Sequence, residues 1–523
     1  MEQITNYECK TDFILPNNTS LIQLTQTIVK SKYKKRKCNE CNKRRKPAKK
    51  SHLICHVCYE VKRYNVKQSG NKVIDDFIRN TQISLVKNAG KMEFVPYDQF
   101  KNIEFIAEGG FSKVYKAIWI KGPVRGWNYR SSNRLGNYPV VLKKLNNSNN
   151  ITSKELNELK VYYNYSSKQK NDYYKYHTNN NYVCKYFGIT QDPNSQNIMI
   201  IMPYYDSGDL INYITNCFYD VGWRKKLAKL KKIMQGLANI HDANIIHRDF
   251  HSGNIFIGNK NIVFVDKITI GDLGISKSTT ESSCNENYGI IPYMAPEIFQ
   301  GKKYTKASDI YSFGIIMWEL MTGRRPFWDR NHDTELIIEI FDGLRPPIVT
   351  NAPNGYIELM KECWHSDPEK RPHATDIYDK IDKMKDEEWK NSCNKNPTEI
   401  VKSSDIGPVT TNNPNAIYKS RNLSGMISTA MSLRSLRSHQ SINLGNIAEQ
   451  FNYYRKNNKT STGKRKYEND LIEDKNDSGS IKRKKLFENK NNDYLSEEIK
   501  FDIDINFNNN EYITIENDFD INL

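Results

Sequence analysis

Apolar and polar residues follow two different patterns between about residue 94 and residue 390. Short apolar runs favour β-strands, and apolar residues three or four positions apart favour amphipathic helices. Residues 106–119 are predicted to form a strand, a glycine turn and a strand, and residues 140–145 a further strand. From residue 389 the chain is rich in Asn, Lys, Ser and Asp, so residues 389–523 are predicted to be a disordered, low-complexity tail.

A helix is also predicted just ahead of this region. Ile74, Phe77, Ile78 and Leu85 fall close to one helical face, and two aspartates stand near the start of the helix. Such a face is typical of an ordinary packing helix, and we predict no further function for it.

The chain carries a local excess of positive charge. Its formal net charge is +18, but residues 30–67 alone hold fifteen Lys and Arg against Glu40 and Glu60, which is 15 − 2 = +13. The charge therefore describes one short segment and not the main domain.

No stretch of the sequence is expected to cross a membrane. No apolar segment follows Met1, and the apolar stretch Phe313–Met321 is too short to span a bilayer. We therefore expect a soluble, cytoplasmic protein with no membrane partner. Two basic clusters, 464–466 and 482–485, make nuclear import an alternative.

Four of the ten cysteines have the spacing of a metal site. Cys38 and Cys41 form one C-x2-C pair, and after thirteen intervening residues Cys55 and Cys58 form another. Two such pairs can present four thiolates to one tetrahedral Zn²⁺, which would supply the folding energy of a segment too small for its own core. His52 and His56 are interpreted as bystanders, and the remaining cysteines as single reduced thiols.

The cysteine segment is also strongly basic, which leaves two interpretations open. It could bind nucleic acid or an acidic partner, or it could be a structural staple with a solvated face. The second is favoured, because aromatic residues that could stack on bases are not interleaved with the charges. The basic side chains concerned are Lys34, Lys35, Arg36, Lys37, Lys43, Arg44, Arg45 and Lys46.

A glycine turn and two charged residues suggest phosphate binding. Backbone amides at Gly109 and Gly110 could approach phosphate oxygens closely, although an ordinary hairpin turn is the better explanation of these glycines when they are taken alone. Lys143 lies on the following strand, and Glu158, at the start of a predicted helix, is an anion that could hold it in place.

With further motifs, the chain from about Tyr97 to Lys385 resembles a protein kinase. "HRDFHSGN" at 247–254 matches the catalytic loop, "DLG" at 272–274 the metal-binding triplet and "APE" at 295–297 the end of the activation segment. The resemblance implies that Lys143 contacts the phosphates of ATP and pairs with Glu158, that Asp249 is the catalytic base, and that Asn254 and Asp272 hold Mg²⁺. It also implies that Asp309 braces the catalytic loop and that Arg371 pairs with Glu297.

The resemblance also implies an ATP site between the glycine loop and the hinge. Met202 is the expected gatekeeper, Pro203 offers its carbonyl and Tyr205 its N–H to adenine, and Asp209 is placed to bind the ribose. The complete set comprises Ile106, Ala107, Glu108, Gly109, Gly110, Phe111, Ser112, Val114, Lys143, Met202, Pro203, Tyr205 and Asp209.

The sequence is most similar to the tyrosine-kinase-like group, through "YSFGIIMWEL" and "ECW". An expanded fungal set in that group similarly carries a CxxC-type segment, followed by residues like "SGNKVIDDFI".

Several positions depart from the family pattern. Ala107 and Ser112 replace two loop glycines and should weaken ATP binding without abolishing it. His251 stands where serine/threonine kinases have a lysine, and Ile290 where they have a threonine. We interpret this as the replacement of one interacting pair. Arg248 precedes the catalytic aspartate and is expected to pair with an activation-loop phosphate, with these candidates: Ser276, Ser278, Thr279, Thr280, Ser282 and Ser283.

The expected fold is α+β: a two-lobed kinase with an antiparallel N-lobe plus one helix and a mainly helical C-lobe. The predicted domains are an N-terminal extension (1–30), a four-cysteine zinc segment (31–67), a linker helix (68–93), a kinase domain (94–388) and the tail (389–523). The expected function is MgATP-dependent phosphorylation of Ser or Thr, with Tyr as an alternative, on protein substrates in signal transduction. A catalytically inactive pseudokinase scaffold and a zinc-dependent nucleic-acid binder are the alternatives.

Overall fold

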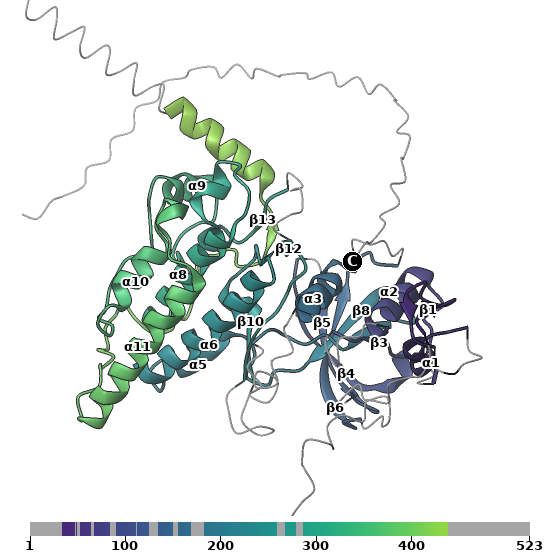
Figure 1. Cartoon of the computed structure of the whole chain (residues 1–523). Helices are drawn as coiled ribbons and strands as arrows, with labels where there is room; N and C mark the ends of the chain where they lie inside the picture. Colours follow the sequence, from purple (N-terminus) through teal and green to yellow (C-terminus); the bar gives the residue numbers. More distant parts are fainter. Residues whose placement is uncertain are drawn as a thin grey trace, which may run out of the picture. The chain divides into compact units, whose positions relative to one another are not determined.

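The computed structural model describes residues 34–47, 49, 53–63, 67–83, 90–110, 112–124, 134–149, 155–168, 182–258, 267–278 and 286–437. Within them, a β-sheet region is followed along the chain by a mostly helical region (Figure 1). This arrangement confirms the predicted two-lobed α+β fold.

Six strands form the sheet of the N-lobe, in the spatial order β3–β7–β8–β6–β5–β4. Neighbouring strands are antiparallel except for the short β3, which pairs parallel to β7. The strands are β3 (Glu93–Phe94), β4 (Phe100–Glu108), β5 (Ser112–Trp119), β6 (Tyr138–Leu145), β7 (Gly188–Gln191) and β8 (Ile198–Pro203).

Both faces of this sheet are covered, as β8 shows. All six of its residues are buried, and they alternate between two cores because successive side chains of a strand point to opposite faces. Ile198 and Ile200 belong to the large core, which also contains Leu159 of helix α3 (Asn157–Lys168). Met199 and Ile201 belong to a smaller core with Trp119 and Val140.

The C-lobe is built around helix α8 (Lys306–Thr322), which is buried from Ser308 to Thr322. Its first turn is closed by a capping box between Thr305 and Ser308, and Gly323 ends it in the left-handed conformation (φ 75°) that glycine adopts without strain. The other helices are α5 (Leu210–Cys217), α6 (Trp223–Asp242), α7 (Pro296–Phe299), α9 (Thr334–Phe341), α10 (Tyr356–Cys363) and α11 (Ala374–Cys393).

Three further strand pairs are short. They are β9 (Ile245–Ile246) with β12 (Lys277–Ser278), β10 (Ile255–Gly258) with β11 (Lys267–Ile270), and β13 (Tyr288–Gly289) with β14 (Arg421–Asn422). Single 3-10 turns occur at η1 (Tyr97–Gln99), η2 (Ser252–Asn254), η3 (Ile291–Tyr293) and η4 (Pro368–Lys370).

The N-terminal residues form a small module that is joined to the sheet by a helix. The module contains the strand pair β1 (Arg36–Lys37) and β2 (Arg44–Arg45) and helix α1 (His56–Arg63). Helix α2 (Lys72–Gln82) follows and is the predicted linker helix, capped by the side chain of Asn71. Its buried residues Ile74 and Ile78 belong to the large core.

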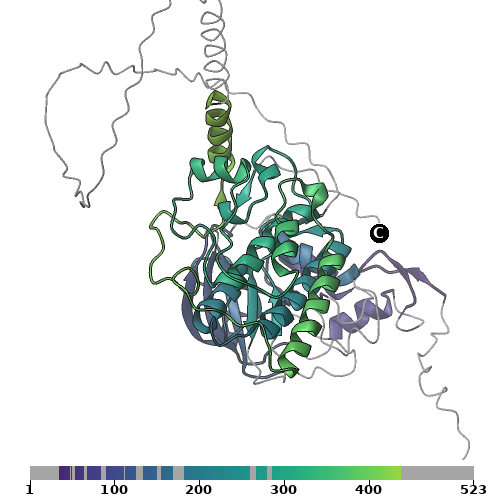
Figure 2. The same cartoon turned by 90° about the vertical axis from the view of Figure 1, so that its left-hand side faces the viewer.

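Beyond α11 the structure differs from the prediction of a tail that is disordered from residue 389. Residues 396–437 run back over the C-lobe and end in helical residues 424–437, drawn yellow-green beside α9 (Figures 1 and 2). The stretch is poor in apolar residues, yet Ile406, Leu423, Ile427 and Ala430 are each at most 5% exposed, so burial of a few well-placed side chains anchors it. Residues 438–523 lie outside the described part of the chain.

Candidate active site

Lys143 on β6 lies between two acidic residues from other elements. Its Nζ is 3.0 Å from Glu158 Oε2 on α3 and 2.7 Å from Asp272 Oδ1. Burial disfavours the ammonium, but these two carboxylates outweigh burial and raise the pKa of Lys143. Lys143 is therefore a fixed positive charge held on a rigid strand.

The carboxyl of Glu158 has a second partner, which the sequence did not indicate. The hydroxyl of Tyr186 donates to Glu158 Oε1 at 2.8 Å. On the same helix, Asn157 donates to the carbonyl of Gly274 at 2.8 Å and so ties α3 to the residues after Asp272. Both contacts hold Glu158 in the position from which it meets Lys143.

The catalytic loop is held from beneath by Asp309 of α8, as the sequence predicted. The two oxygens of Asp309 accept hydrogen bonds from the backbone N–H groups of His247 (2.9 Å) and Arg248 (3.0 Å), and one of them lies 2.9 Å from His241 Nε2. Arg248 has φ 71°, a left-handed conformation that costs a non-glycine residue energy. The buried Asp309 offsets that cost.

Asp249 and Asn254 both belong to the catalytic loop and are connected by a hydrogen bond. Asn254 Nδ2 donates to the Asp249 carbonyl at 2.9 Å, and the Gly271 N–H donates to the Asn254 carbonyl at 2.9 Å. Pairing of β10 with β11 continues this contact. The predicted metal ligands Asn254 and Asp272 therefore lie on adjacent segments. Burial disfavours the Asp272 carboxylate, but Lys143 more than compensates and lowers its pKa.

His251 lies beside the predicted catalytic base. Its Nε2 is 3.7 Å from Asp249 Oδ2, and its Nδ1 accepts a hydrogen bond from the Gly253 N–H at 3.1 Å. Burial opposes protonation, but the charge of Asp249 outweighs it and raises the pKa of His251. The Gly253 bond requires an unprotonated Nδ1, so it favours the neutral ring with its proton on Nε2, toward Asp249.

The glycine loop joins β4 to β5, as predicted. The Gly109 N–H donates to the Ser112 carbonyl at 2.8 Å, and Ser112 is buried. Ile106, Ala107 and Glu108 are exposed at the end of β4, and Ala107 pairs with Val114. Phe111 lies outside the described residues.

The predicted hinge follows β8. Met202 is buried, and Pro203 pairs with Val140 of β6. The ring of Tyr205 stacks on Phe256, with centroids 5.6 Å apart. Asp209 accepts a hydrogen bond from the Asn212 N–H at 2.8 Å and thereby caps α5, a structural role in addition to the predicted ribose contact.

The end of the activation segment is fixed by a buried ion pair that the sequence also predicted. Arg371 donates from both terminal nitrogens to the two oxygens of Glu297, each at 2.7 Å. One of the candidate phosphorylation sites earlier in the segment does not fit: Ser276 is fully buried and donates to the His247 carbonyl at 2.9 Å. Residues 279–285 lie outside the described part of the chain.

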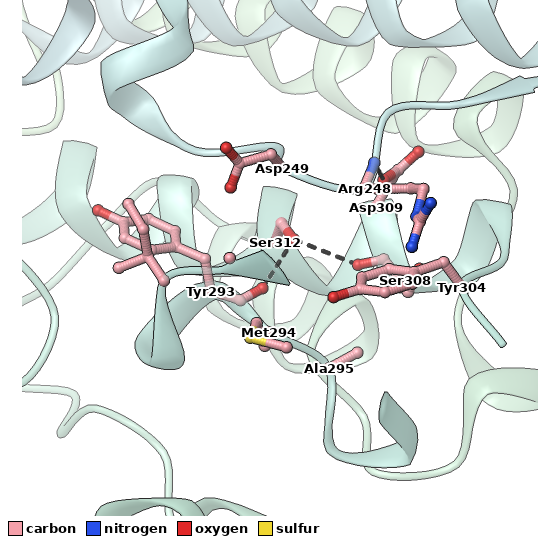
Figure 3. Close-up of a pocket in the computed structure, with 11 residues that line it drawn as sticks. Arg248, Asp249, Tyr293, Met294, Ala295, Tyr304, Ser308, Asp309 and Ser312 are labelled. Carbon is pink, nitrogen blue, oxygen red and sulfur yellow. Dashed lines mark hydrogen bonds between the residues drawn. The ribbon is translucent and has the colours of Figure 1, made fainter. Parts of the chain in front are cut away.

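A small pocket opens between Asp249 and the end of the activation segment (Figure 3). Gly289, Ile290 and Tyr293 line it from the activation segment. On its floor, Ser312 of α8 donates to the Tyr293 carbonyl at 2.8 Å. The pocket is thus bounded by the predicted base and by the chain segment that precedes the APE motif.

The four predicted zinc ligands come together in the N-terminal module. The sulfur atoms of Cys38, Cys41, Cys55 and Cys58 lie within 4.8 Å of one another, and those of Cys41 and Cys55 are 3.8 Å apart. A tetrahedral Zn²⁺ with Zn–S bonds of ~2.3 Å requires sulfurs roughly 3.8 Å apart, so the cluster could hold this metal. The His56 ring instead lies 3.2 Å from the Lys46 carbonyl, and His52 is outside the described residues.

Comparison with known proteins agrees with this geometry. The family model for protein tyrosine and serine/threonine kinases matches residues 100–381. The chain is 34% identical over 183 residues to a protein of Acanthamoeba polyphaga mimivirus named as a serine/threonine-protein kinase/receptor, covering 35% of this chain and 11% of that protein. It is 26% identical over 311 residues to stress-activated protein kinase alpha of Dictyostelium discoideum, covering 57% and 43%.

A third relative is named as a receptor. Ephrin type-B receptor 2 of Gallus gallus is 34% identical over 199 residues, which cover 36% of this chain and 19% of the receptor. The chain thus spans less than half the length of each of these three relatives. The matched region contains every motif that forms the site, from the glycine loop to Arg371, and the chain therefore belongs to the protein tyrosine and serine/threonine kinase family.

Proposed function

We propose that this chain transfers the γ-phosphate of ATP, with Mg²⁺ as cofactor, to serine or threonine hydroxyls of protein substrates in signal transduction. The observation that carries the proposal is the position of Lys143, within 3.0 Å of both Glu158 and Asp272. Phosphoryl transfer requires a lysine held in this way, because the reaction depends on positioning of the phosphates and on neutralisation of their charge.

Each residue of the site has a role in this reaction. Lys143 orients the ATP phosphates, and Asp249 orients the acceptor hydroxyl and takes its proton. Asp272 and Asn254 supply the oxygen ligands that Mg²⁺ prefers, and they lie on adjacent segments. When bound, Mg²⁺ neutralises charge on the transferring phosphate. Serine and threonine are favoured as acceptors because the relative from Acanthamoeba polyphaga mimivirus is named as a serine/threonine-protein kinase/receptor.

An assay with radiolabelled ATP tests the proposal directly. The parent chain should incorporate label into itself or into a protein substrate, and Asp272→Ala should lower the rate by about a hundredfold or more. A parent chain that binds ATP but transfers nothing would instead identify a pseudokinase scaffold. Equal rates in parent and variant would refute the roles given to the site.

We further propose that the cysteine cluster binds Zn²⁺ as a structural staple. Support comes from the sulfur spacing and from the contacts that the module makes with α2. The nucleic-acid alternative predicts salt-sensitive retention of the chain on RNA or DNA, lost when Arg36, Lys37, Arg44 and Lys43 are neutralised.

The location in the cell is proposed to be the cytoplasm. Among the described residues, no helix is both long and apolar enough to cross a membrane. The two basic clusters that make nuclear import an alternative lie outside the described part of the chain.

A further inference from the structure

A strand from the C-terminal region is added to the activation segment. Strand β14 pairs antiparallel with β13, with Asn422 opposite Tyr288 and Arg421 opposite Gly289. The Leu423 N–H continues the pairing by donating to the Asn287 carbonyl at 2.8 Å. The Asn287 N–H in turn donates to Ser424 Oγ at 2.9 Å. An extended segment that adds to an exposed strand in this way is a common mode of peptide recognition.

The same segment lies against the glycine loop. A Cβ atom built on Gly110 would be 2.6 Å from the Ser420 carbonyl oxygen, so only glycine at this position leaves room for the segment. In protein kinases this loop covers the ATP phosphates. Ser420 therefore occupies space next to the loop under which an acceptor hydroxyl must meet the phosphate.

The strand also borders the pocket that contains the catalytic base. Gly289, the partner of Arg421, lines the pocket together with Asp249. The Ser420 hydroxyl oxygen is buried and has no hydrogen-bond partner among the described residues. Residues 420–424 therefore connect the glycine loop with the mouth of the pocket beside Asp249.

Contacts on both sides hold the strand in place. Before it, the Tyr418 hydroxyl donates to the Pro326 carbonyl at 2.9 Å, and the Tyr418 ring lies 4.8 Å from the His332 ring. After it, Leu423 and Ile427 are buried in the C-lobe core. Farther along, Arg437 makes a two-pronged ion pair with Glu335 of α9 at 2.9 and 2.7 Å.

We propose that β13 is the edge on which this kinase docks the extended segment of a protein substrate, and that residues 420–424 occupy this edge as an intramolecular competitor. The proposal rests on the proposed kinase function. Lys143 is already paired with Glu158 in the same structure, so the catalytic residues are assembled while the entrance for the substrate is filled. The tail therefore controls access of the substrate and not the assembly of the site.

A tethered competitor is effective even when its contacts are weak. A segment attached to the same chain acts at an effective concentration on the order of 1 mM. It raises the apparent KM of a protein substrate by a factor set by the ratio of this concentration to the dissociation constant of the segment. The competitor should leave kcat unchanged, because it only excludes the substrate.

The test uses the full chain in three forms: the parent, Leu423→Asp and Leu436→Asp. Leu423 is 1% exposed, so a carboxylate there should expel the strand from the C-lobe core. Residue 423 directly precedes helical residues 424–437, and aspartate is a good N-cap, so the helix itself should survive. Leu436 lies in the same helical stretch and is 61% exposed, which makes Leu436→Asp the matched control.

Two readouts are measured: amide hydrogen exchange over residues 286–290 and 420–424, and steady-state phosphorylation of dephosphorylated casein. Leu423→Asp should speed exchange in both segments and lower the KM for casein by on the order of tenfold, with kcat changed by less than about twofold. Leu436→Asp should behave like the parent in both measurements.

The two readouts separate failure of this proposal from failure of the kinase function. If no form phosphorylates casein although ATP is bound, the proposed function fails, and exchange alone shows whether the strand is docked. Equal exchange in the parent and Leu423→Asp would overturn docking of the strand. Faster exchange in Leu423→Asp with an unchanged KM would overturn the competition.

Discussion

Glu319 of α8 is a buried acid beneath the catalytic loop. Its Oε1 accepts hydrogen bonds from Ser252 (3.0 Å) and from Tyr293 (2.6 Å), while its Oε2 has no partner among the described residues. Burial raises the pKa of Glu319 to about 7, and the two hydroxyls and the nearby charge of Arg325 offset only part of this effect. The residue therefore titrates near neutral pH under the loop that carries Asp249.

We predict that Glu319→Gln removes a pH-dependent loss of stability. Because the pKa is raised in the folded state, the stability contributed by the protonated acid is present below about pH 4.5 and is lost as the pH rises to about 7. The loss is on the order of 3 kcal/mol. The melting temperature of the variant should exceed that of the parent by an amount that grows across this interval and then levels off. Parallel profiles for the two proteins would contradict this interpretation of Glu319.

At the scale of elements, α2 connects the cysteine module to the helix that carries Glu158. At one end of α2, Ile83 packs with Cys38, Cys55 and Cys58, and its carbonyl accepts a hydrogen bond from Arg45 at 2.9 Å. Arg79 also forms an ion pair with Glu40 of the module.

The last residue of α2 and the residues that follow it complete the connection. Gln82 donates to the Met92 carbonyl at 2.8 Å, and a Cβ atom on Gly90 would lie 3.1 Å from Ser166 Cβ of α3. The cysteines lie outside the kinase motifs, and this position alone predicts that loss of the metal leaves the stability of the kinase core unchanged. The contacts through Ile83, Arg45 and Gly90 predict instead that the kinase core becomes less stable when the metal is lost.

We therefore predict that removal of the metal lowers the melting temperature of the kinase core, because α2 loses the cluster on which its C-terminal end packs. A zinc-selective chelator, with Mg²⁺ kept constant, should lower the core transition by on the order of 3 °C. Cys58→Ser should reproduce the effect, whereas Cys217→Ser, at a cysteine outside the cluster, should not. A core transition unchanged by the chelator would show that module and core are thermally independent.

The residues that could be predicted from the sequence are those that stand in a recognisable local motif. Lys143, Asp249 and Asp272 each stand in a motif whose residue types are set by the chemistry of phosphate and metal. Tyr186, which holds Glu158, belongs to no motif, and its role depends on the tertiary approach of the chain before β7 to α3. The strand β14 is only two residues long, polar, and paired with a distant segment, so no periodicity marks it.

At the scale of the whole molecule, the tail shows the limit of composition as a guide. The abundance of Asn, Ser and Lys predicts disorder from residue 389, yet residues 396–437 are packed on the C-lobe. Leu423, Ile427 and Ala430 recur at helical spacing, and this signal could have identified the helical residues 424–437. An average over the composition of a long tail conceals a short anchored segment within it.

The central claim is that Lys143 is the positive charge that positions ATP for transfer. Lys144, its neighbour on β6, instead forms an ion pair with Asp192 and offers a matched control. Phosphoryl transfer by the parent, Lys143→Met and Lys144→Met is therefore compared under saturating MgATP. We predict that Lys143→Met loses at least about a hundredfold in rate and that Lys144→Met stays within about threefold of the parent. A rate for Lys143→Met equal to that of Lys144→Met would contradict the account.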